Sequence, residues 1–162
     1  MSVSILVVED KDRTREHVLD VLAPLNFHIV TAKDGLDGLS KAKTESFDMI
    51  LTDDKMPVMD GLSLLKNLRE LEPYRDAPIF FMTTQDLTEV EPKALKAGAT
   101  ACFSKPLQAE PVREQIKTHI QRSVAWSFNY RLNDKGNYRV MTLEQLKNTI
   151  AAIEDYPKPG IT

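Results

Sequence analysis

The chain has 162 residues, enough for one well-packed domain and an appendage but too few for two full-sized domains. Hydrophobic residues make up 42% of it and charged residues 28%, and the net charge of −3 does not favour nucleic acid or an acidic membrane surface as a partner. The longest apolar runs, such as Ile5–Val8, are far shorter than the roughly 20 residues of a membrane span.

The amino terminus has no basic region, no long apolar core and no small-residue cleavage site, so we expect no secretory signal and a soluble protein. The single cysteine, Cys102, excludes an internal disulfide and fits a reducing compartment. We therefore expect a cytoplasmic location.

Five short apolar runs recur along the first part of the chain, and a segment with helical spacing follows each of them. The runs are Ile5–Val8, Ile29–Thr31, Met49–Thr52, Ile79–Met82 and Ala101–Phe103. Apolar positions within residues 18–25, 36–42, 62–71, 90–97 and 112–120 predict the helices. This alternation predicts an α/β fold, a doubly wound five-stranded parallel sheet with helices on both faces.

Single residues indicate where several of these helices begin or end. Asp60 is expected to cap the third helix at its amino end, and Gly98 to cap the fourth at its carboxyl end. Pro92 is expected in the first turn of the fourth helix, or to shorten it, and Pro111 near the start of the fifth.

The pattern changes after residue 123, which we take as the end of the first domain. Ser127–Leu132 alternates as a half-exposed strand does, residues 133–137 have turn chemistry, and Tyr138–Val140 is again extended in character, which predicts a hairpin. Thr142 and Gln145 form a capping box before an amphipathic helix. Residues 124–162 are thus predicted to be an extension of a hairpin and a helix, the start of a further, truncated domain.

Two properties of this extension bear on partners. Basic residues outnumber acidic ones between Arg113 and Arg139 and are interleaved with aromatic residues, a mixture that suits single-stranded nucleic acid or an extension packed on the parent domain. We favour packing, so nucleic acid is not an expected partner. The apolar stripe of the predicted last helix either forms a homodimer or covers the domain.

Polar residues follow four of the predicted strands: Glu9 and Asp10 the first, Asp53 the third, Thr83 and Thr84 the fourth, and Lys105 the fifth. The carboxyl ends of the strands converge at one edge of such a sheet, where ligands bind. Three close carboxylates need a divalent cation, and an oxygen-only site suits Mg²⁺. Lys105 and Thr83 supply the charge stabilisation that phosphoryl transfer requires, which makes Asp53 the candidate acceptor.

Asp54 is the rival acceptor. Strand alternation turns its side chain away from that of its neighbour, so a structural or supporting role is expected for it.

These residues, together with Met56-Pro57, Met59-Asp60-Gly61, Gly98-Ala99 and Lys105-Pro106, make residues 3–122 resemble the receiver domain of bacterial two-component response regulators, the CheY-like family. The resemblance implies a flavodoxin-like receiver fold in which a histidine kinase, a phosphotransfer protein or a small phosphodonor phosphorylates Asp53. It implies that Asp10 is the main Mg²⁺ ligand, Glu9 an outer or water-mediated one, and the carbonyl oxygen of Lys55 a further one.

By the same resemblance, Lys105 holds a phosphoryl oxygen and Thr83 turns toward the phosphoryl group as a switch. Thr84, Lys55 and Gln85 are predicted to border the bound group, the last two at positions that set how fast water removes it. Phosphorylation is expected to change the affinity for a downstream partner of a face made of the fourth helix, the fifth strand and the fifth helix. Cys102 departs from the family, which has an aromatic residue coupled to the threonine at this position.

Several alternatives remain open. The chain is either a phosphoacceptor signalling domain, not an enzyme beyond self-phosphorylation from phosphodonors and autodephosphorylation, or a receiver-like interaction module that is never phosphorylated. Residues 141–162, with Asp155–Ile161, resemble the amino-terminal segment of adenine phosphoribosyltransferases, which suggests the regulatory half of a longer fusion. A haloacid-type hydrolase is disfavoured because the second position after Asp53 is Lys55, which is not an acid.

Overall fold

The structure is a computed structural model that describes the backbone of residues 3–131 and the side chains of residues 3–120. Five strands, β1 (Ser4–Val8), β2 (His28–Ala32), β3 (Met49–Asp53), β4 (Ile79–Thr83) and β5 (Ala101–Ser104), form one sheet in the order β2-β1-β3-β4-β5. Every pair of neighbouring strands is parallel. The predicted five-stranded parallel sheet is confirmed.

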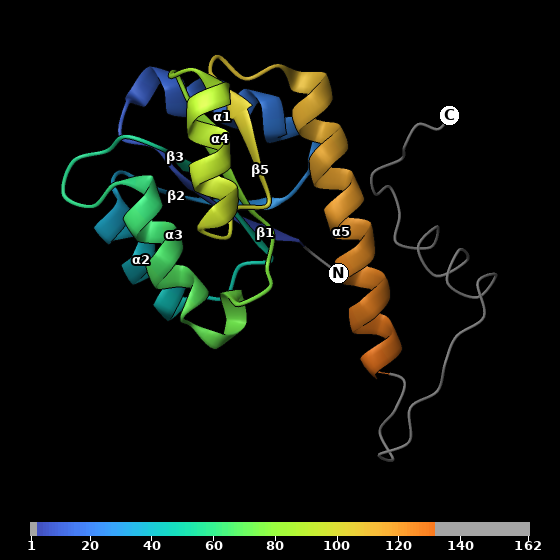
Figure 1. Cartoon of the computed structure of the whole chain (residues 1–162). Coiled ribbons are helices and arrows are strands. Elements are labelled where there is room, and N and C mark those ends of the chain that lie inside the picture. The colour runs from blue at the N-terminus through green and yellow to red at the C-terminus, as the bar shows by residue number, and fades with distance from the viewer. Residues whose placement is uncertain (1–2, 132–162) are drawn as a thin grey trace. The chain divides into compact units, whose positions relative to one another are not determined.

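Helices connect the strands: α1 (Asp12–Leu22) with the 3-10 turn η1 (Ala23–Leu25), α2 (Gly35–Thr44), α3 (Gly61–Arg69) with η2 (Glu72–Tyr74), α4 (Leu87–Lys96) and α5 (Ala109–Arg131). In Figure 1, α4 crosses in front of the strands. The carboxylate of Asp60 accepts a hydrogen bond from the backbone N–H of Ser63, which confirms the predicted cap of α3. Gly98 follows α4 with φ +111°, the left-handed conformation that suits glycine after a helix.

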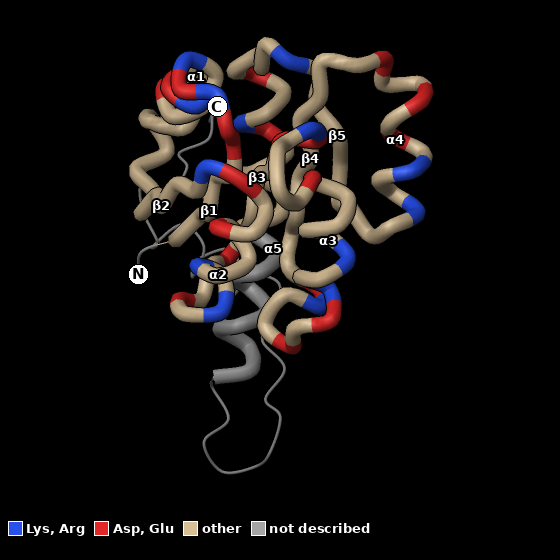
Figure 2. The backbone as a smooth tube through the Cα atoms, turned by 90° about the vertical axis from the view of Figure 1, so that its left-hand side faces the viewer, with Lys and Arg blue, Asp and Glu red and all other residues tan. Residues whose placement is uncertain are grey.

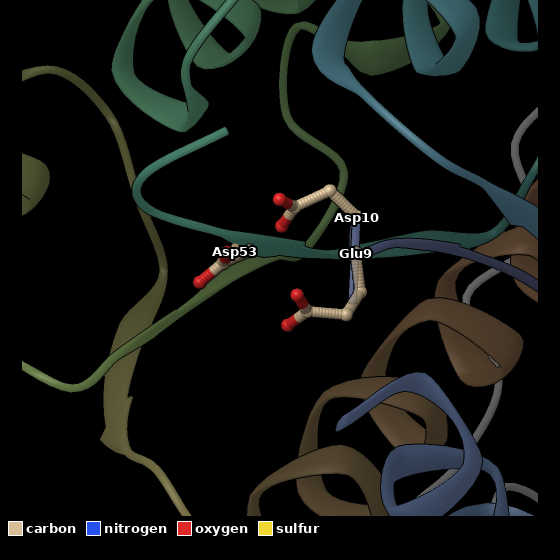
Figure 3. Close-up of side chains that lie close together, drawn as sticks. All are labelled: Glu9, Asp10 and Asp53. Carbon is tan, nitrogen blue, oxygen red and sulfur yellow. The ribbon is translucent and has the colours of Figure 1, made fainter. Parts of the chain in front are cut away.

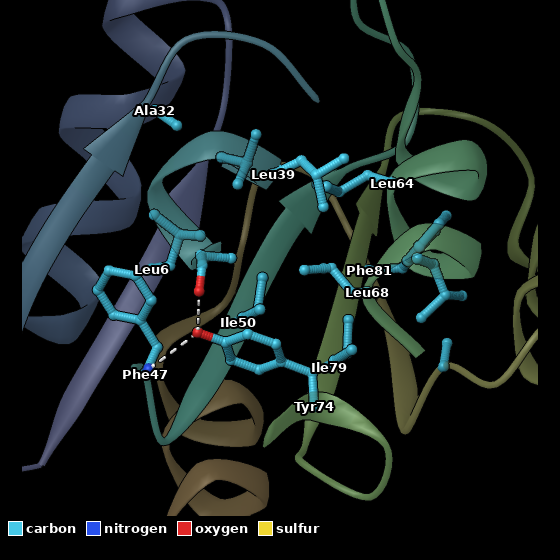
Figure 4. Close-up of a cluster of buried hydrophobic side chains, with 14 of the residues drawn as sticks. Leu6, Ala32, Leu39, Phe47, Ile50, Leu64, Leu68, Tyr74, Ile79 and Phe81 are labelled. Atoms are coloured by element: carbon cyan, nitrogen blue, oxygen red, sulfur yellow. Dashed lines mark hydrogen bonds between the residues drawn. The ribbon is translucent and has the colours of Figure 1, made fainter. Parts of the chain in front are cut away.

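The core lies on both faces of the sheet. Alternate strand residues, such as Leu6, Ile50 and Phe81, join side chains of α2, α3 and α4 in one buried cluster (Figure 4). The intervening residues, including Val7 and Leu51, are also fully buried but lie outside this cluster, as do the buried residues of α1. Helices α2, α3 and α4 therefore cover one face of the sheet and α1 packs on the other, as the doubly wound pattern predicts.

The strand order reverses direction between β1 and β3. In an open parallel sheet this is the point where a crevice forms at the carboxyl ends of the strands. Gly61 keeps the segment after β3 close to the sheet, because a Cβ there would overlap the carbonyl oxygen of Asp53. The backbone N–H of Gly61 donates to the carbonyl of Asp54 at 2.8 Å. The sequence thus holds the end of β3 in a fixed position.

One of the two expectations about helix prolines is wrong. Pro92 lies inside α4, beyond its first turn, because Asp86 starts the helix early by accepting the N–H of Thr88. Pro111 is the third residue of α5, as expected.

The strand expected at Ser127–Leu132 does not form, because α5 continues through Arg131. No glycine or proline stands between Pro111 and Arg131, so the sequence of the described helix has no helix-breaking residue after its first turn, and a six-residue alternation is too short to exclude helical structure. The expected domain end at residue 123 falls within this helix. The remaining predictions for the extension, the turn, the second strand and the amphipathic helix, lie outside the described residues.

Acidic and basic positions are interspersed along the described backbone, as Figure 2 shows. Among the described helices, none combines the length and the apolar character needed to cross a membrane. Neither the charge pattern nor the helices identify the function. The residues that bear on it lie in the crevice at the carboxyl ends of the strands.

Candidate functional site

Three carboxylates gather where β1 and β3 end. Glu9 and Asp10 directly follow β1, and Asp53 is the last residue of β3. Figure 3 shows the three side chains extending to the same side of the strand ends, and one oxygen of each lies within 4.8 Å of the others. Because like charges at this distance repel, the group needs positive charge nearby.

Lys105 supplies part of that charge. Its Nζ lies 2.7 Å from Asp53 Oδ1 and 3.0 Å from Glu9 Oε1, and its side chain is only 6% exposed. Burial by itself would lower the pKa of Lys105, but the hydrogen bonds to Asp53 and Glu9 raise it above its ordinary value. Lys105 is therefore a fixed cation between two carboxylates.

Burial makes the ionised form of Asp53 and Glu9 less favourable than it is in water. Burial raises the pKa of Asp53, although the hydrogen bond from Lys105 acts in the opposite direction. Burial and the neighbouring charge of Asp53 raise the pKa of Glu9. Three carboxylates share one ammonium, so the group keeps an excess of negative charge that favours a bound cation.

One carboxylate oxygen of Asp10 has no hydrogen-bond partner among the described residues. Its Oδ1 is buried and accepts no hydrogen bond from any residue in the described part of the chain. A buried carboxylate oxygen without a partner is costly, and a cation with oxygen ligands relieves that cost. The donor set is made of oxygens alone, so the residues present fit Mg²⁺.

Thr83 ends β4, next to the site. Its hydroxyl donates to Oδ2 of Asp54 at 3.2 Å and accepts from the backbone N–H of Gln85 at 3.0 Å. The sequence reasoning missed Thr83 as the partner of Asp54, and the structural or supporting role expected for Asp54 stays a prediction. The strand register contains the signal: Asp53 is opposite Met82, so the residues that follow them, Asp54 and Thr83, are neighbours.

The other predicted site residues lie at the rim. Lys55 and Thr84 are exposed. Thr84 and Lys105 line a cavity of about 320 Å³ together with Lys11, Arg13 and His17, none of which was expected to be a site residue. These three residues lie in α1 or just before it, shortly after Glu9 and Asp10, and this closeness in sequence could have indicated that they border the site. The acidic group therefore has a more basic border on the side of α1.

Cys102 is buried in β5 and belongs to the cluster that includes Phe81, its register partner. Burial raises the pKa of its thiol to about 11, so it behaves as a small apolar residue, as expected. Phe103 does not replace the missing aromatic residue. Its ring packs against Phe80 at 5.7 Å between centroids, on the face opposite to Cys102.

Comparison with known proteins agrees with this geometry. A family model, the response regulator receiver domain, matches residues 5–117. Chemotaxis protein CheY-3 of Vibrio cholerae is 33% identical over 122 residues, which cover 75% of this chain and 94% of that protein.

A sensor histidine kinase and a solved receiver domain are also similar to this chain. The sensor histidine kinase RcsC of Escherichia coli is 31% identical over 73% of this chain, which spans only 12% of the kinase. The crystal structure of the receiver domain of the sensor histidine kinase PA1611 from Pseudomonas aeruginosa has a magnesium ion in its active-site cleft. It superimposes with a TM-score of 0.68 at 27% identity, covering 74% of this chain and 98% of that one. This chain belongs to the response regulator receiver domain family.

Proposed function

We propose that this chain receives a phosphoryl group on Asp53, in a Mg²⁺-dependent reaction, from the phosphohistidine of a sensor histidine kinase or phosphotransfer protein. The observation that carries the proposal is the contact of Lys105 Nζ with Asp53 Oδ1 at 2.7 Å, within a group of three carboxylates. This arrangement pairs a nucleophilic oxygen with the cation that neutralises the incoming charge.

The chemistry is a displacement at phosphorus. An oxygen of Asp53 attacks, the P–N bond of the phosphohistidine breaks, and the imidazole leaves with its electron pair and takes up a proton, while an acyl phosphate remains on Asp53. Lys105, already fixed by Glu9, stabilises the charge on the phosphoryl oxygens.

Asp10, Asp53, the carbonyl oxygen of Lys55 and, more remotely, Glu9 would hold Mg²⁺. The ion, when bound, neutralises charge on the phosphoryl oxygens and orients them for in-line attack. Support comes from the unpartnered Oδ1 of Asp10 and from the oxygen-only donor set.

The readout of phosphorylation in this proposal is the hydroxyl of Thr83, which turns toward the phosphoryl group. That movement changes the packing of α4, β5 and the first turn of α5, and with it the affinity for a downstream protein. Lys55, Thr84 and Gln85 border the phosphoryl group, and Lys55 and Gln85 govern how fast water removes it. The chain is a signalling domain, whose own chemistry is limited to self-phosphorylation and autodephosphorylation.

The alternative of a receiver that is never phosphorylated has less support, because an interaction module needs neither a buried lysine between carboxylates nor an unpartnered buried Asp10 oxygen. Fusion with a phosphoribosyltransferase, and a homodimer formed through the carboxyl-terminal extension, stay predictions that fall outside the described residues.

The test is the intact mass of the protein after incubation with phosphoramidate and Mg²⁺. We expect the gain of one phosphoryl group, and we expect that Asp53→Asn and a chelator each abolish it. Asp54→Asn is the matched control, since it removes the neighbouring carboxylate and should still be labelled. Labelling of Asp53→Asn but not of Asp54→Asn would assign the acceptor to Asp54, and no labelling of the unmodified chain would favour the interaction module.

A further inference from the structure

Asp54 and Thr83 form a buried polar pair at the edge of the phosphoacceptor site. Asp54 is 7% exposed and Thr83 is 1% exposed, and 3.2 Å separates Asp54 Oδ2 from the hydroxyl oxygen of Thr83. The backbone N–H of Gln85 donates to the same hydroxyl oxygen, so the hydroxyl proton is directed to the carboxylate. Such hydrogen bonds to an ionised acceptor are stronger than those between neutral groups.

A threonine hydroxyl has one proton to donate. In this structure the hydroxyl donates that proton in a hydrogen bond to the Asp54 carboxylate, and a phosphoryl group on Asp53 would offer a second anionic acceptor on the neighbouring residue. The hydroxyl cannot donate to both at once. The Asp54 carboxylate is therefore a competitor for the donor that the phosphoryl group needs.

The backbone keeps this competitor in place. The N–H of Asp54 donates to the carbonyl of Met82 at 2.9 Å, and its carbonyl accepts from Gly61 at 2.8 Å. Cys102, a small side chain, lies on the same face of the sheet. With Phe103 turned to the other face, the fifth strand brings no aromatic ring to this pair, and the anionic Asp54 is the group that the described residues place against the hydroxyl.

We propose that Asp54 is a positioning residue that retains the Thr83 hydroxyl in the unphosphorylated arrangement and so sets the threshold for switching. The inference rests on the proposed phosphorylation of Asp53. Removal of the Asp54 charge weakens the competing hydrogen bond, which shifts the equilibrium toward the arrangement that a phosphoryl group stabilises. By linkage, a phosphoryl mimic then binds more tightly.

The experiment is a double-mutant cycle on the affinity for beryllium trifluoride with saturating Mg²⁺, measured by ¹⁹F NMR for the unmodified protein, Asp54→Asn, Thr83→Val and the double variant. Asn has the shape of Asp and keeps an acceptor oxygen, and Val has the shape of Thr without the hydroxyl. We expect Asp54→Asn to tighten binding about fivefold when Thr83 is present, and at most about twofold in the Thr83→Val background, since hydrogen bonds to charged groups exceed neutral ones by about 1 kcal/mol. The residual effect in the second background measures plain repulsion between Asp54 and the mimic.

A second readout follows the Thr83 methyl group by ¹H–¹³C NMR without the mimic. In Asp54→Asn its resonance should move from the position of the unmodified protein toward the position of the mimic-saturated protein. Thermal unfolding of each variant establishes that it is folded.

The outcomes separate the two proposals. Equal effects of Asp54→Asn in both Thr83 backgrounds, with an unmoved methyl resonance, would overturn the role of Asp54 while leaving phosphorylation of Asp53 intact. No binding of the mimic to any variant, together with no mass gain from phosphoramidate, would instead overturn the proposed function itself.

Discussion

The two ends of the sheet differ in whether their buried polar groups have hydrogen-bond partners. At the end where β3 and β4 begin, the Tyr74 hydroxyl lies 2.7 Å from the carbonyl oxygen of Ala42 and 2.9 Å from that of Glu45, and it accepts from the N–H of Phe47 at 3.2 Å (Figure 4). At the end where β1 and β3 finish, one oxygen of Asp10 has no partner among the described residues.

The difference separates stability from function within one sheet. Satisfied polar groups around Tyr74 fix the packing of α2 and η2 against the strands, whereas the carboxylates at the other end repel one another in the absence of a bound cation. Substitutions near Tyr74 should therefore destabilise the protein. Substitutions of the carboxylates at the other end should reduce their mutual repulsion and abolish Mg²⁺ binding or phosphorylation.

The largest effect is expected at Tyr74. Tyr74→Ala should lower the free energy of unfolding by about 4 kcal/mol, because it removes a fully buried ring as well as its hydrogen bonds. Tyr74→Phe keeps the ring and should cost about 1–2 kcal/mol. Urea unfolding followed by circular dichroism measures both, and equal losses for the two variants would show that the hydroxyl network, not the packing, dominates this end.

The next effect is that of the metal. Mg²⁺ at about 100 times its dissociation constant should raise the free energy of unfolding by about 2.7 kcal/mol relative to the protein in chelator. Asp10→Asn should remove most of this gain, because Asp10 is the proposed main ligand. The matched control is Asp12→Asn, an exposed carboxylate paired with Arg15, which should keep the gain. An undiminished gain in Asp10→Asn would exclude Asp10 as a ligand.

A smaller effect is expected from pH in the absence of metal. Burial raises the pKa of Asp53 above the ordinary value of about 3.9, so between these two values the folded protein binds more protons than the unfolded chain. The free energy of unfolding therefore falls as the pH rises from about 4 through the raised pKa. Asp53→Asn removes this titration, so its stability in chelator should fall less over the same interval.

Asp86 provides a control of opposite sign. Its hydrogen bonds to the backbone N–H and the hydroxyl of Thr88 lower the pKa of its carboxyl, so it contributes stability that is lost as the pH falls through that lowered value. Asp86→Asn should accordingly flatten the acid side of the stability curve and leave the loss above pH 4 in place. If Asp53→Asn and Asp86→Asn change the curve alike, the contrast between buried and capping carboxylates is wrong.

The sequence predicted most of the sheet because its signals are local. Each strand is a short apolar run, so the five strands begin and end within one residue of the expected ranges. The strand at Ser127–Leu132 was wrong because alternation over six residues competes with a helix that nothing interrupts.

The sequence predicted which residues gather at the site, but not which of them form hydrogen bonds or ion pairs with one another. The strand ends bring Glu9, Asp10 and Asp53 to one edge, and that follows from the doubly wound topology. Which partner a side chain selects depends on register and rotamer, so the bond between Thr83 and Asp54, and the division of Lys105 between Glu9 and Asp53, required the structure.

The smallest predicted effect tests strain in the loop that follows the acceptor. Val58 has φ 69° at the centre of a three-residue turn in which the Met59 N–H donates to the Pro57 carbonyl at 2.7 Å, and its side chain is 76% exposed. A β-branched residue is strained in this conformation, which glycine adopts freely. Val58→Gly should therefore raise the free energy of unfolding by about 0.5–1 kcal/mol, since little apolar surface is lost and the gain exceeds the entropy that glycine adds to the unfolded chain.

Asn26, with φ 55° after η1, is the matched control for Val58→Gly. Asparagine tolerates the left-handed region, so Asn26→Gly should change stability by less than about 0.5 kcal/mol. Urea unfolding of both variants in chelator gives the comparison. If Val58→Gly instead lowers the free energy of unfolding, by as much as Asn26→Gly changes it or more, the loop after β3 is not strained. The unfavourable energy at this end of the sheet then comes from the carboxylates alone.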